Sequence, residues 1–348
     1  MKAFKLEQWN HPGTYVEIPK PIPGHGECLI KIRAAGLCRS DLDMLDSKPN
    51  SAPWATAISP GYILGHENAG IIEALGEGIS DLKVGEGVVV HHLKHCGVCA
   101  FCVNGAEQHC EKYKRGDVVL TRGAGIDGGL AEYLVAPRSE LVSIGDRDPV
   151  LYAPLTDAGV TAYHAVKSFI HRVRPNSTTA VIGIGGLGAY GVQFIKILSA
   201  AKIFAIDKSE GCLTTAKELG ADEVLLSDAS TATKILDMTN GNGIDYIVDF
   251  VGNDQTLALA AKISRPQGRI VVVGMEGGSV KLGWNHMATS CEFALSMGST
   301  RQDLEDVCSL ATAGKLRIDM QRFSFDQIQE AYDLLRAGRL TGRAVIVM

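Results

Sequence analysis

Short apolar runs alternate with amphipathic segments from about residue 154 onward. The apolar runs are rich in branched residues, as in strands buried on both faces, and the segments between them have helical spacing. The predicted strands are 180–184, 202–206, 223–226, 246–251 and 269–273, and the predicted helices between them are 209–219, 231–238 and 255–263. This alternation predicts an α/β Rossmann fold with a doubly wound parallel sheet.

The first 150 residues have a different pattern. Short strand-like runs at 28–34, 69–75, 87–91 and 131–135 are separated by turn residues, as at 21–24 and 76–78. Many short strands with Gly-rich and Pro-rich turns are typical of an all-β, barrel-like domain. We therefore expect a mostly-β domain before the α/β region.

The last part of the chain predicts one more short strand, helices at 303–313 and 325–337, and a final strand at 344–347. We expect this tail to return to the first domain. The expected organisation is a mostly-β domain at 1–153, an α/β domain at 154–290, and a return to the first domain at 291–348. At 348 residues the chain is long enough for two separate cores.

A glycine-rich turn follows the strand at 180–184. Gly183, Gly185 and Gly188 match G-x-G-x-x-G, in which the glycines allow a tight turn, the approach of a pyrophosphate, and close packing of helix on strand. Such a turn alone is weak evidence, because it can simply join two elements. Asp207, however, ends the next predicted strand, where a carboxylate would accept hydrogen bonds from a ribose and repel a 2′-phosphate. NAD is therefore favoured over NADP, although Lys208 softens this preference.

The composition is that of an ordinary globular protein. The net charge of −5 comes with no basic patch, which argues against nucleic acid and anionic membranes as partners. No apolar run approaches the length of about 18 residues that spans a bilayer, and the N-terminus lacks the apolar core of a signal peptide. Nine cysteines without such a signal indicate a reducing compartment, so we expect a cytoplasmic protein.

Four of the nine cysteines form a C-x₂-C-x₂-C-x₇-C cluster, within a lobe at about 92–115. Four thiolates this close can surround one tetrahedral Zn²⁺ in a closed, structural site. An iron–sulfur cluster or free thiols are the alternatives, but the seven residues before the last cysteine favour zinc over a ferredoxin-type run. The predicted ligands are Cys96, Cys99, Cys102 and Cys110.

Three other residues are candidate metal ligands, although each has an ordinary structural explanation. Cys38 could be a small buried hydrophobic residue, His66 a hydrogen-bonded loop histidine, and Asp157 a carboxylate at the start of a helix. Taken alone, the structural explanation is favoured for each of the three residues.

Taken together, these motifs resemble a known family. The C-x-S-D motif at Cys38, the G-H-E triplet at His66, the four-cysteine lobe and the GIGGLG turn occur in the order and spacing of zinc-dependent medium-chain alcohol dehydrogenases. The resemblance implies a GroES-like mostly-β catalytic domain with an inserted Rossmann domain. It is closest to bacterial NAD-dependent enzymes for secondary alcohols and ketones, which share the Leu-Thr-Asp-Ala-Gly stretch around Asp157.

The resemblance also implies individual roles. Cys38, His66 and Asp157 would hold a catalytic zinc with Glu67 close behind, and Ser40 would take the proton of the alcohol. Further NAD contacts are expected from Arg39, Gly186, Leu187, Val251, Gly274 and Arg343. The histidine that ends the proton relay in many relatives corresponds to Asp43, and the basic residue that often packs on adenine corresponds to Cys212.

The substrate pocket is expected to include Trp54, His92, Leu120 and Met297, although ordinary core or loop positions explain each of them as well. His92 and Met297 stand where relatives often carry aromatic residues, which indicates a different or roomier substrate. A polyol, amino-alcohol or formaldehyde dehydrogenase of the same superfamily is one alternative, and a non-catalytic nucleotide-binding protein is a more remote one. Bacterial relatives are commonly homotetramers, so we expect a homo-oligomer, a tetramer more than a dimer.

Overall fold

The computed structural model describes residues 1–348, apart from the side chains of Pro53 and Trp54. The chain forms two compact units. Unit 1 comprises Met1–Val160, Gly298–Gly314 and Ile318–Met348, and unit 2 comprises Thr161–Met297 and Lys315–Arg317. No helix in the part of the chain that the structure describes is both long and apolar enough to cross a membrane.

Unit 2 is a six-stranded, wholly parallel sheet with the strand order β13-β12-β11-β14-β15-β16. Its strands are β11 (Thr178–Ile182), β12 (Lys202–Asp207), β13 (Glu223–Leu226), β14 (Ile244–Asp249), β15 (Ser264–Val272) and β16 (Glu292–Leu295). Its helices are α5 (Ala158–Ile170, which begins in unit 1), α6 (Gly188–Leu198), α7 (Glu210–Glu218), α8 (Thr231–Met238) and α9 (Asp254–Ile263). This order is that of a dinucleotide-binding doubly wound sheet, so the predicted fold class is confirmed.

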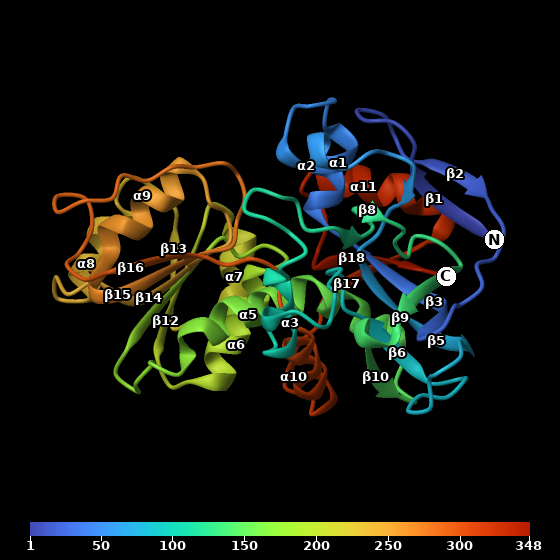
Figure 1. The fold of residues 1–348 in the computed structure, drawn as a ribbon. Helices are drawn as coiled ribbons and strands as arrows, with labels where there is room; N and C mark the ends of the chain where they lie inside the picture. The colour runs from blue at the N-terminus through green and yellow to red at the C-terminus, as the bar shows by residue number, and fades with distance from the viewer. The chain divides into compact units, whose positions relative to one another are not determined.

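The apolar runs of unit 2 form strands because both faces of the sheet are covered. Figure 1 shows α8 and α9 on one face, and α6 and α7 pack on the other. Ile247 of β14 lies in a buried cluster with Leu257 and Ile263 of α9. The carboxyl ends of the parallel strands meet at one edge, which brings the turn after β11 next to Asp207 at the end of β12.

Unit 1 is mostly β. A seven-stranded sheet has the order β10-β6-β5-β3-β18-β17, with β9 also paired to β3, and a three-stranded sheet has the order β2-β1-β4. The strands are β1 (Lys2–Leu6), β2 (Thr14–Glu17), β3 (Glu27–Leu37), β4 (Tyr62–Ile63), β5 (Glu67–Leu75), β6 (Gly87–Val90), β7 (Thr121–Arg122), β8 (Gly125–Ile126), β9 (Tyr133–Pro137), β10 (Leu141–Gly145), β17 (Met320–Ser324) and β18 (Arg343–Val347).

The helices of unit 1 are short, and they connect or cover the strands (Figure 1). They are α1 (Arg39–Asp46), α2 (Pro53–Ala57), α3 (Ala100–Val103), α4 (Pro149–Tyr152), α10 (Arg301–Thr312) and α11 (Ile328–Arg336), with 3₁₀ turns η1 (Glu107–His109), η2 (Arg138–Glu140), η3 (Ala153–Thr156) and η4 (Phe325–Gln327). The C-terminal tail joins this unit through β18, which pairs antiparallel with β3.

Strand register places three functional candidates in a row. Ala344 of β18 pairs with Leu37 of β3, and Gly36 of β3 pairs with Glu67 of β5. Arg343, Cys38 and Glu67 therefore lie beside one another although they are far apart in sequence. Gly36 is required at this point, because a Cβ there would collide with the Glu67 side chain.

Several predicted boundaries differ from the structure. β14 ends at Asp249 rather than at 251, because the Asp249 carboxylate accepts hydrogen bonds from the backbone N–H groups of Val251 and Gly252 (2.8 and 3.1 Å) and turns the chain. The predicted strand at 131–135 is β9, Tyr133–Pro137, since Ala131 makes an isolated bridge to Ala3 instead. The helix predicted from 325 begins as the 3₁₀ turn η4.

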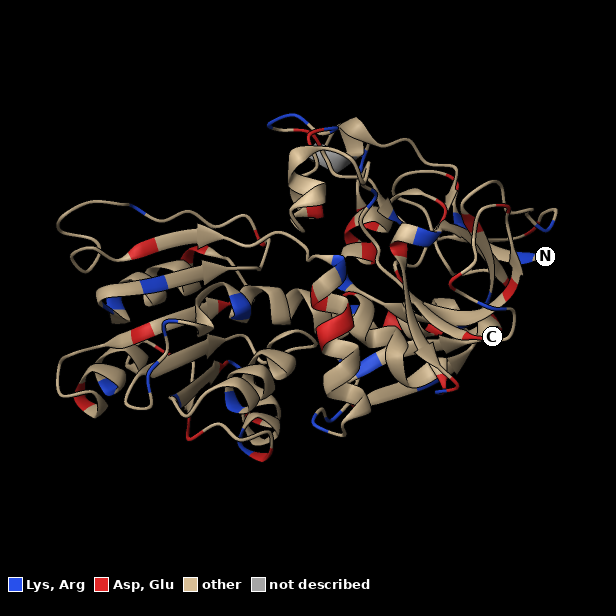
Figure 2. Ribbon diagram, turned by 60° about the horizontal axis from the view of Figure 1, so that its bottom comes forward, with Lys and Arg blue, Asp and Glu red and all other residues tan. Residues whose placement is uncertain are grey.

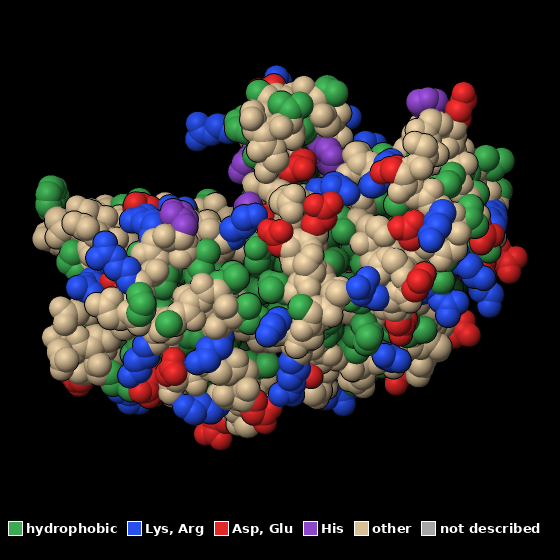
Figure 3. All heavy atoms as spheres, turned by 90° about the horizontal axis from the view of Figure 1, so that it is seen from below, with side chains coloured by type: hydrophobic (Ala, Val, Ile, Leu, Met, Phe, Trp, Pro, Cys, Tyr) green, Lys and Arg blue, Asp and Glu red, His purple; other side chains and the backbone are tan. Residues whose placement is uncertain are grey.

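Charged side chains are spread over both units. In Figure 2, Lys and Arg alternate with Asp and Glu along the ribbon, and on the face shown in Figure 3 basic and acidic side chains are interspersed. Neither view shows a continuous basic area of the kind that tracks a nucleic-acid backbone.

Candidate active site and cofactor site

Two groups of side chains in unit 1 have the geometry of metal ligands. In the first group, the ligand atoms of Cys38, His66, Glu67 and Asp157 all lie within 4.8 Å of one another. Cys38 follows β3 as the N-cap of α1, His66 follows Gly65 in the left-handed region (φ +91°), and Asp157 lies between η3 and α5. Three segments distant in sequence thus converge on one largely buried point.

Asp41 orients the His66 ring. Its Oδ1 lies 3.0 Å from His66 Nδ1, within ion-pair distance but without hydrogen-bond alignment, and its Oδ2 accepts from the backbone N–H of Cys38 at 2.9 Å. His66 Nε2 then faces Asp157 Oδ2 and the Ser40 hydroxyl, each at 3.4 Å. A carboxylate behind a histidine is the usual device that fixes which ring nitrogen binds a metal.

Glu67 and Arg343 form a buried ion pair beside this group. Arg343 Nη2 donates to Glu67 Oε1, whereas Glu67 Oε2 is buried with no hydrogen-bond partner among the described residues. Burial raises the pKa of Glu67 to about 8, although the Arg343 charge opposes this rise. Glu67 therefore presents one oxygen whose bonding capacity is unused inside the cluster.

The electrostatics of the cluster fit a bound cation. Burial alone would lower the pKa of His66, but the Asp41 and Asp157 carboxylates outweigh it and raise this pKa well above its ordinary value. Burial would likewise raise the pKa of Asp157, yet its hydrogen bond to His66 holds it well below the usual range. The site favours a positive charge among its carboxylates, and a divalent cation held by Cys38, His66 and Asp157 would supply it.

The second group is the four-cysteine lobe. Cys96, Cys99, Cys102 and Cys110 are mutually close, with Cys99 Sγ 3.4 Å and Cys96 Sγ 3.9 Å from Cys102 Sγ. All nine cysteines of the chain are free thiols. Backbone N–H groups of Val98 and Cys99 lower the pKa of Cys96 to about 6, whereas burial raises that of Cys102 to about 12. Four sulfurs around one point fit a closed tetrahedral zinc site.

The glycine turn in unit 2 has the shape that a pyrophosphate requires. Gly183 adopts φ +82°, and a Cβ on Gly188 would strike the Gly183 carbonyl, so both positions require glycine. A Cβ on Gly185 would meet no atom within 4 Å, which leaves open space beside the turn. The helix α6 begins at Gly188, so its free N–H groups lie at this turn.

Asp207 is bonded to the same turn. Its Oδ2 accepts from the backbone N–H of Ile184 at 2.6 Å, and its Oδ1 accepts from Ser209 N–H at 2.8 Å. Each carboxylate oxygen has a second lone pair, so both can also accept from a ribose hydroxyl. Gly274 packs directly on the Val251 backbone, because a Cβ there would collide with it.

The structure also places the other predicted residues. Arg39 and Ser40 are exposed in the first turn of α1, His92 is buried, and Leu120 is half-buried against the core of unit 1. Met297 is exposed and belongs to unit 2. The Trp54 side chain lies outside the described residues. Their roles as substrate or cofactor contacts stay predictions.

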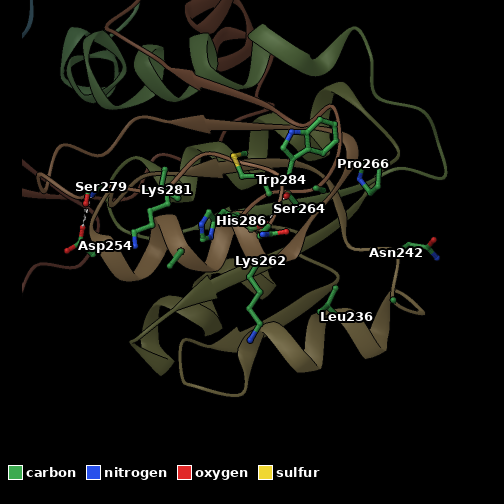
Figure 4. Close-up of a pocket in the computed structure, with 17 residues that line it drawn as sticks. Leu236, Asn242, Asp254, Lys262, Ser264, Pro266, Ser279, Lys281, Trp284 and His286 are labelled. Atoms are coloured by element: carbon green, nitrogen blue, oxygen red, sulfur yellow. Dashed lines mark hydrogen bonds between the residues drawn. The ribbon is translucent and has the colours of Figure 1, made fainter.

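A separate pocket of about 740 Å³ lies along α9 in unit 2 (Figure 4). It is lined by α9, the segment after α8, the start of β15 and the loop 279–288, and Asp254 accepts hydrogen bonds from Ser279 within it. None of the predicted zinc or NAD residues lines this pocket. The converging ligands and the glycine turn therefore define the candidate site.

Comparisons with known proteins agree with this geometry. The alcohol dehydrogenase GroES-like domain family matches residues 24–146, and the zinc-binding dehydrogenase family matches residues 186–313. The chain is 32% identical to an NAD-dependent alcohol dehydrogenase of Sulfurisphaera tokodaii over 100% of both chains. It is also 32% identical to D-arabinose 1-dehydrogenase (NADP(+)) of Saccharolobus solfataricus, over 99% of this chain and 97% of the relative.

Among solved structures, the alcohol dehydrogenase of Aeropyrum pernix superposes with a TM-score of 0.91 at 30% identity, over 100% of both chains. This chain therefore belongs to the zinc-dependent alcohol dehydrogenase family and is an oxidoreductase of that class. The predicted resemblance is confirmed.

For two residues of the site, the sequence did not predict the contacts that the structure shows. The sequence marks Asp41 only as part of the C-x-S-D motif, although its position three residues after Cys38 allows it to cap α1 and reach His66. Arg343 is expected to contact NAD, and in the structure its guanidinium pairs with Glu67. The first contact has a local sequence signal, and the second depends on the pairing of β18 with β3.

Proposed function

We propose that this enzyme transfers hydride between NAD(H) and secondary alcohols or ketones, with one catalytic and one structural zinc ion per chain. The observation that carries this proposal is the convergence of Cys38, His66 and Asp157 with Glu67 behind them. Zinc at these residues would supply Lewis acidity toward the substrate oxygen, while NAD would accept the hydride.

The chain's own residues then have separate tasks. The Ser40 hydroxyl, 3.4 Å from His66 Nε2, accepts the proton that leaves the substrate hydroxyl and passes its own proton on toward the nicotinamide ribose. Asp41 holds the His66 ring, and Arg343 neutralises Glu67. In unit 2, Asp207 holds the adenosine ribose and the space beside Gly185 receives the pyrophosphate.

A sugar or polyol dehydrogenase is the second candidate, because one relative with 32% identity is a D-arabinose 1-dehydrogenase (NADP(+)). That relative is named for NADP(+), so the preference of this enzyme for NAD or NADP tests the role proposed for Asp207.

We further infer a cytoplasmic protein, and nine free cysteines support this inference. We also infer a homotetramer from the family likeness, which light scattering would test.

The decisive experiment measures initial rates with NAD⁺ and NADP⁺ on primary, secondary, aromatic and polyhydric alcohols, together with zinc content per chain. We expect the highest kcat/KM with NAD⁺ and alcohols that are oxidised at a secondary carbon, polyhydric ones included, and two zinc ions. A preference for primary alcohols or formaldehyde, or equal use of both cofactors, would contradict the proposal.

A further inference from the structure

His92 is held rigidly at the edge of the candidate active site. It follows β6 and is 5% exposed, and its backbone carbonyl accepts from Arg122 N–H at 2.8 Å. Its Nδ1 lies 2.8 Å from the Thr156 carbonyl oxygen. Because a carbonyl only accepts hydrogen bonds, the Nδ1 atom must carry the proton. The orientation and tautomer of the ring are thus set by its neighbours.

In the neutral imidazole ring the other nitrogen, Nε2, is then an acceptor. His92 Nε2 lies 4.0 Å from Asp157 Oδ1, which is also an acceptor. Two acceptors make no hydrogen bond with each other, so His92 Nε2 has no hydrogen-bond donor among the described residues. His92 stands outside the set of ligand atoms that lie within 4.8 Å of one another, so it is a neighbour of the metal cluster and no member of it.

From this geometry we propose that His92 is a specificity-determining residue that accepts a hydrogen bond from a second substrate hydroxyl, next to the one that is oxidised. The preferred substrates are then vicinal diols and polyols. This inference rests on the proposed function, since it concerns the same zinc site and the same hydride transfer.

The energetic reason is the cost of an unpaired buried acceptor. A hydrocarbon arm packed against His92 would separate Nε2 from water and give it no donor, whereas a hydroxyl would donate to it. Loss of one such buried hydrogen bond typically changes the rate or affinity about 10- to 100-fold. An aromatic residue at this position would impose no such cost, so the histidine itself selects for the second hydroxyl.

The test compares 2,3-butanediol with 2-butanol in the wild-type enzyme and in His92→Asn. The asparagine amide can still donate to the Thr156 carbonyl, but it has no atom at the place of Nε2. We expect the ratio of kcat/KM for the diol to that for 2-butanol to fall about 10- to 100-fold in this variant, whatever the change in the two absolute rates. His92→Gln, which offers an amide oxygen farther along the side chain, should keep part of the preference.

Zinc content and NAD⁺ affinity are measured on the same samples. An unchanged ratio in a folded, fully loaded His92→Asn enzyme would overturn the inference while leaving the proposed function intact. Loss of one zinc from that variant would also overturn it, because His92 would then be a metal ligand. Absence of NAD-linked oxidation of 2-butanol and of the diol in the wild type would contradict the proposed function itself and this inference with it.

Discussion

The carboxylate of Asp207 accepts a hydrogen bond of 2.6 Å from the backbone N–H of Ile184, which lies inside the glycine turn. The end of β12 is thereby tied to the end of β11 at the carboxyl edge of the sheet. Asp207 holds the turn in the structure, and it is also predicted to accept hydrogen bonds from the ribose. This double role sharpens the prediction for its replacement.

Asp207→Ala is expected to weaken NAD⁺ binding by about 1–3 kcal/mol, since hydrogen bonds to a charged group are lost. It should also raise the ratio of kcat/KM with NADP⁺ to that with NAD⁺, because the repulsion of a 2′-phosphate is removed. Asp222→Asn is the matched control, since Asp222 accepts from the Ile203 N–H at 2.8 Å in the same sheet. An unmoved cofactor ratio in the Asp207 variant would show that the ribose is bound elsewhere.

Ser40→Ala is expected to lower kcat/KM for alcohol oxidation by about 10²–10⁴, the usual cost of losing a positioned acid or base. Ser40→Thr should keep most activity, and zinc content should not change in either variant. Asp43 corresponds to the histidine that ends the proton relay in many relatives, and it lies one turn after Ser40 in α1. If Asp43 continues the relay, Asp43→Ala should slow oxidation at neutral pH more than at alkaline pH. If both alanine variants turn over at wild-type rates from neutral to alkaline pH, the proton leaves the site through water and the relay through Ser40 is contradicted.

Asp41→Asn is expected to lower the affinity for the catalytic zinc about 10- to 100-fold, because the negative charge beside His66 Nδ1 is lost. The asparagine oxygen can still accept from the Cys38 N–H. The measurement is zinc transfer to a competing chelator, followed separately for the two sites. The four-cysteine site serves as the internal control and should release its metal as in the wild type. Equal zinc retention by variant and wild type at the first site would mean that Asp41 acts only as a helix cap.

Glu292 gives a prediction about pH and stability. Hydrogen bonds from Arg172 and Arg269 hold its pKa below the ordinary value in the folded state. Its contribution to stability is therefore present above the unfolded pKa and is lost as the pH falls through the folded one. The difference in Tm between wild type and Glu292→Gln should be small at pH 7 and should vanish at strongly acidic pH. Glu223→Gln is the control, because it removes a single surface pair with Lys202 and should change Tm less. If the Tm difference between wild type and Glu292→Gln persisted in acid, the lowered pKa of Glu292 would not be its cause.

Sequence patterns predicted the features that depend on local order. The glycine turn with Asp207 and the four-cysteine lobe are local clusters, and the parallel sheet follows from the alternation of strands and helices. The convergence of Cys38, His66 and Asp157 came from a family resemblance, because nothing local links them. The Glu67–Arg343 pair and the tautomer of His92 depend on strand register and on the Thr156 carbonyl, so only the structure shows them.

The central claim is that the converging residues hold a catalytic zinc and the four cysteines a structural one. Zinc per chain, measured beside turnover in the wild type, Cys38→Ser and Cys99→Ser, tests it most directly. We expect two zinc ions in the wild type, one in Cys38→Ser with turnover abolished and Tm near wild type, and a lowered Tm in Cys99→Ser. One zinc ion in the wild type, with activity that survives Cys38→Ser, would contradict the account.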